Sequence, residues 1–500
     1  MTQEDLKSPL LNPQNQNIGD PSNPHDTANS PIHPRPTQSL AQSSLVINEE
    51  EIPDQSLQSG HDGPSGEPSN QVKKATNGNV ETWQNKSLTF FPLVALLYSN
   101  VSGGPFGIET TLRSGGTFFT IIGILVATII WSIPEALMTA ELGTVYPDPV
   151  GSTAWVEDAF GERLAILTGY LNWVSGVADN TLYPGIFLDN CVRLFSSNKN
   201  NKFLKKGGPR FAIVSFISTV WTAINCLDLN TVGMLNTVTN IIALLPFVVI
   251  FFIGLPKINP KRWLQMPDTN ETYKDLFPDS SSPGPLPLIK MGGILLRPYV
   301  NNLFWETTAY DSGASYSSEV KDLKNDYPKA NIHTIWIVAL SYLFPVMICT
   351  GVKDSNQKDY VDGYFTVVAK YIGGTALGSF MVFGAALSQI GIFQGDMSSD
   401  SLLLMGMAQH GYAPKIFAHR NKRLGTPVNA ILLSYIVIIA LGSLSIDRIM
   451  NMQNFCLCMK LIFEYASYLK LRYQNDHSKY PYDRVNMMII IHYALKSSMI

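Results

Sequence analysis

The most informative pattern is the alternation of long apolar runs with short polar connections, which starts near residue 87. Runs at 118–133, 241–255, 335–349 and 430–444 approach the length of a bilayer crossing and contain almost no charge. Soluble domains rarely repeat such uncharged runs, because a helix that is apolar on every side needs lipid or protein around it. The pattern therefore predicts an all-α polytopic membrane protein.

The residues before the first apolar run have the opposite character. Residues 1–86 are rich in Ser, Asn, Gln, Pro and Asp and contain only isolated apolar side chains. Such a segment cannot bury enough surface to offset its chain entropy. We expect a disordered cytoplasmic tail over 1–86, a transmembrane domain over 87–471 and a short C-terminal tail over 472–500.

The apolar runs and the breakers between them predict about ten membrane spans, in two sets of five. The expected spans are 88–111, 118–141, 163–195, 211–227, 232–255, 291–320, 333–350, 369–396, 427–444 and 450–471. Pro134 is expected to kink the second span, because proline removes a helical hydrogen bond.

Two of these spans are expected to be interrupted. The first contains Gly103-Gly104-Pro105-Phe106-Gly107, which disfavours a continuous helix. The sixth contains the polar stretch 301–316, which is too polar to face lipid as a regular helix. Interrupted helices at matching positions of two halves are typical of inverted-repeat transporters, whose substrate site lies at the interruptions.

Charge, composition and motifs give no support to a nucleic-acid-binding, metal-binding or enzymatic function. The 500 residues carry a net charge of −3, which favours no nucleic-acid partner, and we expect none. The five cysteines show no metal-ligand spacing, and no nucleophile–base pair or phosphate loop is evident. We therefore expect no metal, no cofactor and no enzymatic activity.

Membrane orientation is weakly encoded. The basic residues of the loops are nearly balanced between the two sides, so they do not decide it. A glycosylation sequon, Asn270-Glu-Thr272, lies in the long loop after the fifth span and favours a cytoplasmic N-terminus. We expect the plasma membrane as the location, with an internal membrane as the alternative.

Acidic residues inside the expected spans are the main candidates for function. They are Glu109, Glu135, Asp179, Glu306, Asp311 and Asp396. Charged groups in a membrane are costly and usually functional. Lys460 is the one basic residue found at comparable depth. Carboxylates without matching cations favour a cationic substrate, a coupling proton or both.

Position divides these acids into groups. Glu109 and Asp311 adjoin the two interruptions and are expected to bind substrate, while Glu135 and Glu141 lie near a kink and a helix end. We expect Glu135 and Glu141 to couple protons or to gate the transport pathway, and we expect Asp396 to have a structural role. Aromatic residues beside carboxylates suit an organic amine. The expected substrate-binding residues are Ser102, Gly103, Gly104, Phe106, Gly107, Glu109, Trp173, Asp179, Trp305, Glu306, Tyr310 and Asp311.

Several motifs together resemble the plant-type polyamine uptake transporters of the amino acid–polyamine–organocation superfamily. The motifs are Val101-Ser-Gly-Gly-Pro-Phe-Gly-Ile-Glu109, Trp131-Ser-Ile-Pro-Glu-Ala-Leu-Met-Thr-Ala-Glu-Leu-Gly143, Trp173-Val-Ser-Gly-Val-Ala-Asp-Asn-Thr-Leu-Tyr-Pro184, Asp362-Gly-Tyr-Phe365 and Asp396-Met-Ser-Ser-Asp-Ser401. The resemblance extends from about Ser87 to Tyr482. It implies a leucine-transporter-like fold with five-plus-five inverted repeats, broken first and sixth helices, and proton-coupled import of polyamines such as putrescine or spermidine.

The sequence departs from that family at three points. Glu306 stands where an uncharged asparagine is expected, and Lys460 interrupts a tenth helix that is apolar or glycine-containing in the family. The family usually has about twelve spans, so the resemblance implies that the C-terminal two are missing here.

Two alternatives remain open at this stage. An L-type or cationic amino-acid transporter would use free amides at the first interruption to bind a substrate carboxylate. A truncated, non-transporting sensor or partner-binding protein is the other. Uptake of labelled spermidine compared with leucine separates these three hypotheses.

Overall fold

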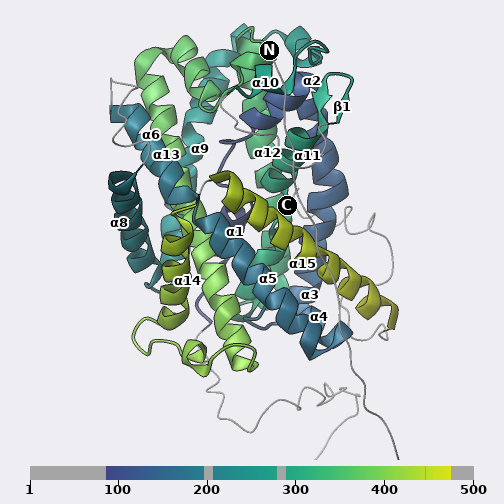
Figure 1. The fold of residues 1–500 in the computed structure, drawn as a ribbon, viewed down its shortest axis with the longest axis vertical. Helices are drawn as coiled ribbons and strands as arrows, with labels where there is room; N and C mark the ends of the chain where they lie inside the picture. The colour runs from purple at the N-terminus through teal and green to yellow at the C-terminus, as the bar shows by residue number, and fades with distance from the viewer. Residues whose placement is uncertain (1–85, 196–206, 279–288, 445, 475–500) are drawn as a thin grey trace, which may run out of the picture. The chain divides into compact units, whose positions relative to one another are not determined.

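The computed structural model describes residues 86–195, 207–278, 289–444 and 446–474, and these residues are mainly helical (Figure 1). The expected tail over 1–86 and most of the expected tail over 472–500 lie outside the described residues. The α-helices are α1 (Phe90–Val101), α2 (Glu109–Ala127), α3 (Ile133–Val145), α4 (Ser152–Phe160), α5 (Glu162–Asn180), α6 (Tyr183–Phe195), α8 (Gly208–Asn225), α9 (Leu229–Gly254), α10 (Tyr273–Leu276), α11 (Leu296–Thr307), α12 (Leu323–Val352), α13 (Tyr364–Gln409), α14 (Val428–Leu441) and α15 (Ile446–Gln474).

Shorter elements join some of these helices. A π-helical turn, Thr128–Ser132, joins α2 to α3 directly before Pro134, and a 3₁₀ segment, η4 (Tyr310–Glu319), follows α11. Strands β1 (Lys290–Met291) and β2 (Ile294–Leu295) form an antiparallel hairpin in which Lys290 pairs with Leu295.

Within the described residues, four helical stretches are long and apolar enough to cross a membrane. They are Glu109–Val145, Leu229–Lys257, Leu323–Val352 and Tyr364–Gln409. Helices α1 and α14 are apolar but shorter. The fold is therefore that of a multi-pass helical bundle.

Helix α9 shows how the bundle suits lipid. Its large exposed side chains recur three or four residues apart, so they lie on one face of the helix. They are Met234, Leu235, Val238, Ile241, Leu245, Val248, Phe252 and Ile253. The opposite face buries polar residues, including Asn236 and Asn240. A continuous apolar face of this length is suited to lipid contact, whereas on a soluble protein it would promote aggregation.

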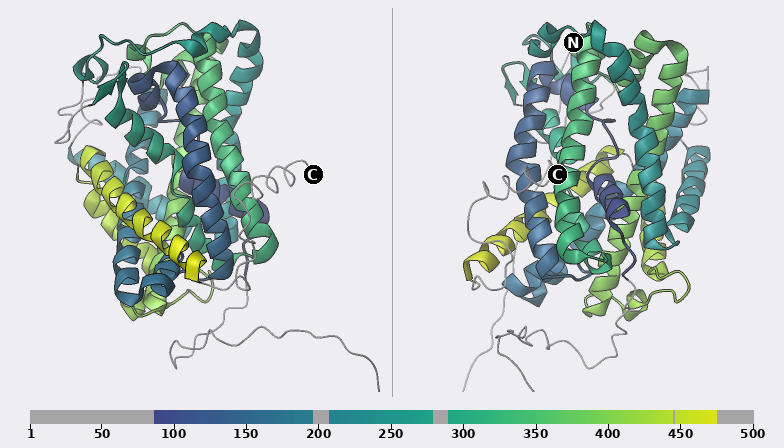
Figure 2. Two further views of the ribbon diagram at one scale, coloured as in Figure 1. Left: turned by 90° about the vertical axis from the view of Figure 1, so that its right-hand side faces the viewer. Right: turned by 180° about the vertical axis from the view of Figure 1, so that it is seen from behind.

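Helix α13 is the central element of the packing. It contacts α9, α6, α5 and α1 along its 46 residues, and Figure 2 shows α15, in yellow, crossing the bundle obliquely. The apolar side chains form two large buried clusters. One lies around α2, α9, α12 and the first half of α13, and the other lies around α5, α14 and the second half of α13.

Two predicted boundaries were wrong. The third expected span is interrupted at Thr181–Leu182, between α5 and α6, and the eighth does not end at Asp396. Helix α13 continues to Gln409, because buried partners satisfy its polar stretch: Asn225 donates to the carbonyl and side chain of Gln394 at 2.9 Å. Asp396 and Asp400 consequently lie inside a long helix instead of at its end.

An ion-pair cluster holds the end of α13 against α4 and the connection that precedes it. His410 Nε2 lies 2.9 Å from Asp148 Oδ2, and His410 Nδ1 lies 3.2 Å from Glu157 Oε2. The hydrogen bond to Asp148 raises the pKa of His410, and the charge of Glu157 adds to the effect. The charged form of the histidine therefore stabilises this contact.

We predict that His410→Gln destabilises the protein only at pH values at which the histidine of the wild type is charged. The pKa of His410 is higher in the folded protein than in the unfolded chain, where it is about 6.5. The charged histidine therefore contributes its full stabilisation below pH about 6.5, and this contribution is lost as the pH rises through the pKa of the folded state. Thermal unfolding in detergent should show a deficit of about 0.5–1 kcal/mol at pH about 6 that disappears at pH about 9. His419→Gln is the control, and an equal deficit at both pH values would contradict the prediction.

Candidate functional site

The first helical interruption separates α1 from α2 over residues 102–108. Gly104 and Gly107 have φ angles of 126° and 113°, which side-chain-bearing residues rarely adopt. The carboxylate of Glu109 accepts the Gly107 amide at 2.9 Å and the Gly363 amide at 3.3 Å. Glu109 therefore stabilises the interruption and ties it to the start of α13.

The second interruption separates α11 from η4 at Thr308–Ala309. Ala309 has a φ of 81° and is the one non-glycine residue with positive φ in the described part of the chain. Glu135 on α3 accepts the hydroxyl of Thr308 at 3.0 Å and the amide of Asp311 at 3.5 Å. The Glu135 carboxylate thus accepts hydrogen bonds from donors that lack helical partners because the helix is interrupted.

The two interruptions lie against each other. Asn302 on α11 donates to the carbonyl of Gly107 at 3.2 Å and to the hydroxyl of Thr111 at 2.9 Å. A Cβ atom on Gly107 would lie only 2.5 Å from Glu306 Oε1. Glycine at this position therefore lets the carboxylate of α11 approach the backbone of the first interruption.

A cavity of about 320 Å³ opens at this meeting point. Nine of the residues expected to bind substrate line it: Ser102, Gly103, Gly104, Phe106, Gly107, Glu109, Asp179, Trp305 and Glu306. The remaining walls come from α6, α12, α13 and α15, with Tyr342, Gln389 and Gln453 among their side chains. The structure thus gathers residues that are up to 358 positions apart in the sequence, from Ser99 to Leu457.

The carboxylates of the cavity differ in how they are satisfied. Glu306 is buried, and its Oε2 accepts the hydroxyl of Tyr342 while its Oε1 has no hydrogen-bond partner. Asp179 accepts the hydroxyl of Tyr183 and the indole N–H of Trp305, the latter at 3.2 Å. An unpartnered carboxylate oxygen in a buried cavity is costly unless a proton or a cation completes it.

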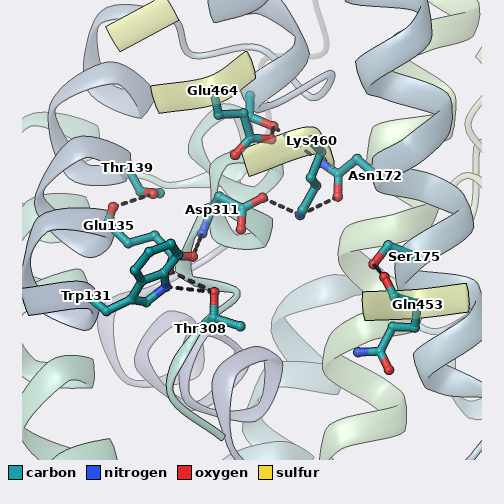
Figure 3. Close-up of polar contacts among 11 residues, drawn as sticks. Trp131, Glu135, Thr139, Asn172, Ser175, Thr308, Asp311, Gln453, Lys460 and Glu464 are labelled. Carbon is teal, nitrogen blue, oxygen red and sulfur yellow. Dashed lines mark hydrogen bonds and ion pairs between the residues drawn. The ribbon is translucent and has the colours of Figure 1, made fainter. Parts of the chain in front are cut away.

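Three expected substrate-binding residues do not line the cavity. Trp173 donates its indole N–H to Ser434 at 3.1 Å and packs in an apolar cluster. Tyr310 is buried in the other large cluster. Asp311 lies behind the wall, because the 3₁₀ turn after Ala309 directs it toward α15 (Figure 3).

Asp311 already has a cation. Lys460 Nζ lies 2.5 Å from Asp311 Oδ2 and 2.8 Å from Asn172 Oδ1, and both charged side chains are fully buried (Figure 3). The expectation that the buried acids lack matching cations is therefore wrong for Asp311. One helical turn along α15, Glu464 is buried beside them. We call Lys460, Asp311, Glu135, Glu464 and Asn172 the Lys460 cluster.

The two residues expected to couple protons or gate the pathway also lie outside the cavity wall. Glu135 binds the second interruption as described above. Glu141 accepts the hydroxyl of Tyr468 at 3.1 Å and lies 3.5 Å from Arg472, so it joins α3 to α15. Both acids contact elements that follow the second interruption.

Sequence reasoning missed several residues of the site. Tyr342, the partner of Glu306, is one hydroxyl in an apolar run, and nothing local marks it. Asn302 was visible only as part of a polar stretch. The proximity of Lys460 to Asp311 depends on the crossing of α15 over α5, which no sequence pattern reports.

Apolar helices of membrane length around a cavity that is lined by carboxylates at two helical interruptions are typical of a multi-pass membrane transporter. The sequence comparison gives its family. Residues 88–496 match the amino acid permease family, and the chain belongs to it. The prediction of a multi-pass membrane transporter of this superfamily is confirmed.

Similar proteins include plant polyamine transporters. Polyamine transporter RMV1 of Arabidopsis thaliana is 35% identical over 418 residues, covering 84% of this chain and 78% of its own length. Polyamine transporter PUT1 of Oryza sativa subsp. japonica is 35% identical over 397 residues, covering 79% of this chain and 69% of its own length. These relatives are transporters and not enzymes.

A solved structure is similar in fold. The crystal structure of MhsT in complex with L-phenylalanine aligns with a TM-score of 0.54 at 12% sequence identity, covering 81% of this chain and 95% of that one. At this identity the similarity concerns the arrangement of helices alone.

We predict that Gly107→Ala destabilises the site. The added Cβ forces a strained φ and lies 2.5 Å from Glu306 Oε1, so an unfolding deficit of about 1–3 kcal/mol is expected. Thermal unfolding of the purified protein measures it. Gly208→Ala is the control, because a Cβ there meets no atom within 4 Å. Equal stability of the two variants would contradict the prediction.

Proposed function

We propose that the protein is a secondary transporter that imports polyamines of the putrescine and spermidine class together with protons. The observation that carries this proposal is the charge of the cavity wall. Five acidic residues line the cavity and one basic residue does: Glu109, Asp179, Asp189, Glu306 and Asp362, with Arg193. Asp189 is paired with Arg210 at 2.6 Å, which leaves four carboxylates to one basic side chain. A wall with this excess of carboxylates favours a substrate with more than one positive charge.

The cavity offers an alkyl diamine suitable groups. The unpartnered oxygen of Glu306 can accept one ammonium group, and Asp179, which accepts the indole N–H of Trp305, is a second carboxylate in the same cavity. Phe106 and Trp305 provide apolar surface for methylene groups and ring faces for cations. Each ammonium group loses its hydration on entry and needs such partners.

The same geometry disfavours the amino-acid alternative. A substrate carboxylate would require free amides at the first interruption. The Gly104 amide donates to the Ser102 hydroxyl at 3.1 Å, and the Gly107 amide donates to Glu109. Two of the amides that such a substrate needs are thus already engaged.

The proposed architecture is a five-plus-five inverted repeat of the leucine-transporter type. Elements α1 to α9 form the first repeat and α11 to α15 the second, giving ten spans over the transmembrane domain 87–471. The interruptions after α1 and after α11 occupy corresponding places in these repeats. We place the N-terminus in the cytoplasm and the protein in the plasma membrane, so that uptake enters the cell.

Glu306→Gln should weaken substrate binding. If Glu306 pairs with an ammonium group, its loss costs roughly 2–5 kcal/mol, a factor of tens to thousands in affinity for spermidine. Radiolabelled uptake at equal surface expression measures the change in KM. Glu319→Gln is the matched control, because Glu319 pairs with Arg420 and does not line the cavity. Wild-type affinity in Glu306→Gln would contradict the proposed contact.

Uptake should depend on an inward proton gradient. Spermidine uptake is expected to rise as the external pH falls from neutral to mildly acidic, and to collapse with a protonophore, because the coupled protons then provide no driving force. The measurement is the initial rate of spermidine uptake by transporter-deficient cells that express the protein, at several external pH values, with and without sodium. Leucine uptake in place of spermidine uptake, or sodium dependence without a pH response, would reject the proposal.

A further inference from the structure

The Lys460 cluster is a second group of buried charges, and the substrate cavity does not include it. Lys460, Asp311, Glu135 and Glu464 are each at most 2% exposed, and none of them lines the cavity. Three carboxylates therefore surround one ammonium group. With every group ionised, the cluster would carry two uncompensated negative charges in a dry interior, which is strongly unfavourable.

The hydrogen bonds show which carboxylate is least well compensated. Glu135 accepts two donors, from Thr308 and the Asp311 amide, and Asp311 holds the Lys460 ammonium group. Glu464 accepts one hydroxyl, from Ser152 at 2.7 Å, and its Oε2 has no partner. Asp311 also has one oxygen without a partner, but its other oxygen accepts from a charged ammonium group, whereas the donor to Glu464 is a neutral hydroxyl. Glu464 is therefore the carboxyl group that gains most from a proton.

Other groups around the cluster increase the need for that proton. The carboxylates of Asp396 and Asp400 on α13 lie within electrostatic range of Lys460. The hydroxyl of Tyr465 on α15 lies within electrostatic range of the three acids of the cluster. Tyr310 lies within electrostatic range of Glu135, and Tyr327 lies within electrostatic range of Asp311. Asn172 from α5 and Ser152 from α4 contribute only neutral groups. In the part of the chain that the structure describes, Lys460 is therefore the cation at the centre of a strongly acidic environment.

We propose that the Lys460 cluster is the proton-binding site of the transporter, with Glu464 as the residue that takes up and releases the proton. This inference rests on the proposed proton-coupled transport. The structure shows Lys460 bound to Asp311 on η4 (Figure 3), and we assign this arrangement to the state in which Glu464 is protonated. When the proton leaves Glu464 for solvent, its carboxylate competes for Lys460 from the same helix, four residues away.

The position of the cluster lets this competition act on the transport cycle. Glu135 and Asn172 belong to the proposed first repeat, whereas Asp311 and Lys460 belong to the second. Asp311 also directly follows the interruption that contributes Thr308 and Ala309 to the cavity wall. Moving Lys460 from Asp311 to Glu464 would loosen η4 from α15, so the proton on Glu464 controls the segment that follows Thr308 and Ala309 of the cavity wall.

The test uses the full-length protein in liposomes, with the membrane potential clamped to zero by potassium and valinomycin. An inward gradient of one pH unit should drive about tenfold accumulation of labelled spermidine for each coupled proton in the wild type. Glu464→Gln, which mimics the protonated state, should keep spermidine exchange within about threefold of wild type. Its accumulation ratio should fall to about one.

Three further variants complete the design. Asp311→Asn removes the partner of Lys460 and should likewise lose gradient-driven accumulation while it retains exchange. Glu464→Asp keeps the titrating group and should restore pH-driven accumulation, which a merely structural role would not predict. Glu319→Gln, a control on the same segment η4, should accumulate spermidine as the wild type does.

The outcomes separate this inference from the proposed function. Wild-type accumulation in Glu464→Gln would overturn the inference and leave proton-coupled transport standing. Loss of exchange together with accumulation in Glu464→Gln and Asp311→Asn, with normal unfolding curves, would also overturn it. Absence of any spermidine uptake by the wild type would overturn the proposed function, and this inference with it.

Discussion

The structure depends on one constraint: a backbone polar group inside a membrane must find a partner within the protein. Both helical interruptions break the regular hydrogen-bond pattern, and side chains from other elements replace it. Glu109 accepts the Gly107 amide, Asn302 donates to the Gly107 carbonyl, and Glu135 takes up the Asp311 amide. Ser132 donates to the Thr307 carbonyl at 2.8 Å. The polar residues that line or support the site therefore also make its irregular backbone possible.

The sequence predicted what depends on local pattern and failed where distant segments meet. Apolar runs located most helices, and the glycines and proline at 103–107 located the first interruption. The helical continuation past Asp396 was missed because its support comes from Asn225, about 170 positions away. For the same reason Asp311 was assigned to the cavity, since its partner Lys460 lies 149 positions further along the chain.

Two groups of carboxylates coexist in one bundle because their surroundings differ. In the cavity, Asp179 is satisfied by neutral donors from Tyr183 and Trp305, and Glu306 keeps one oxygen without a partner. Behind the cavity wall, Asp311 is satisfied by a resident ammonium group. A tethered cation thus neutralises the second group, whereas under the proposed function the ammonium groups of the substrate would neutralise the first.

Glu109 has a mechanical consequence through its two amide partners. One carboxylate oxygen holds Gly107 in the first interruption, and the other holds Gly363 at the N-terminus of α13. Helix α13 runs 46 residues through the packed centre and ends beside α4. A shift of the glycine backbone around an occupant of the cavity would therefore pull on the first turns of α13. Gly373 and Gly374 have non-helical backbone angles and kink the helix after these turns, so the start of α13 can hinge while its long second part stays packed in the bundle.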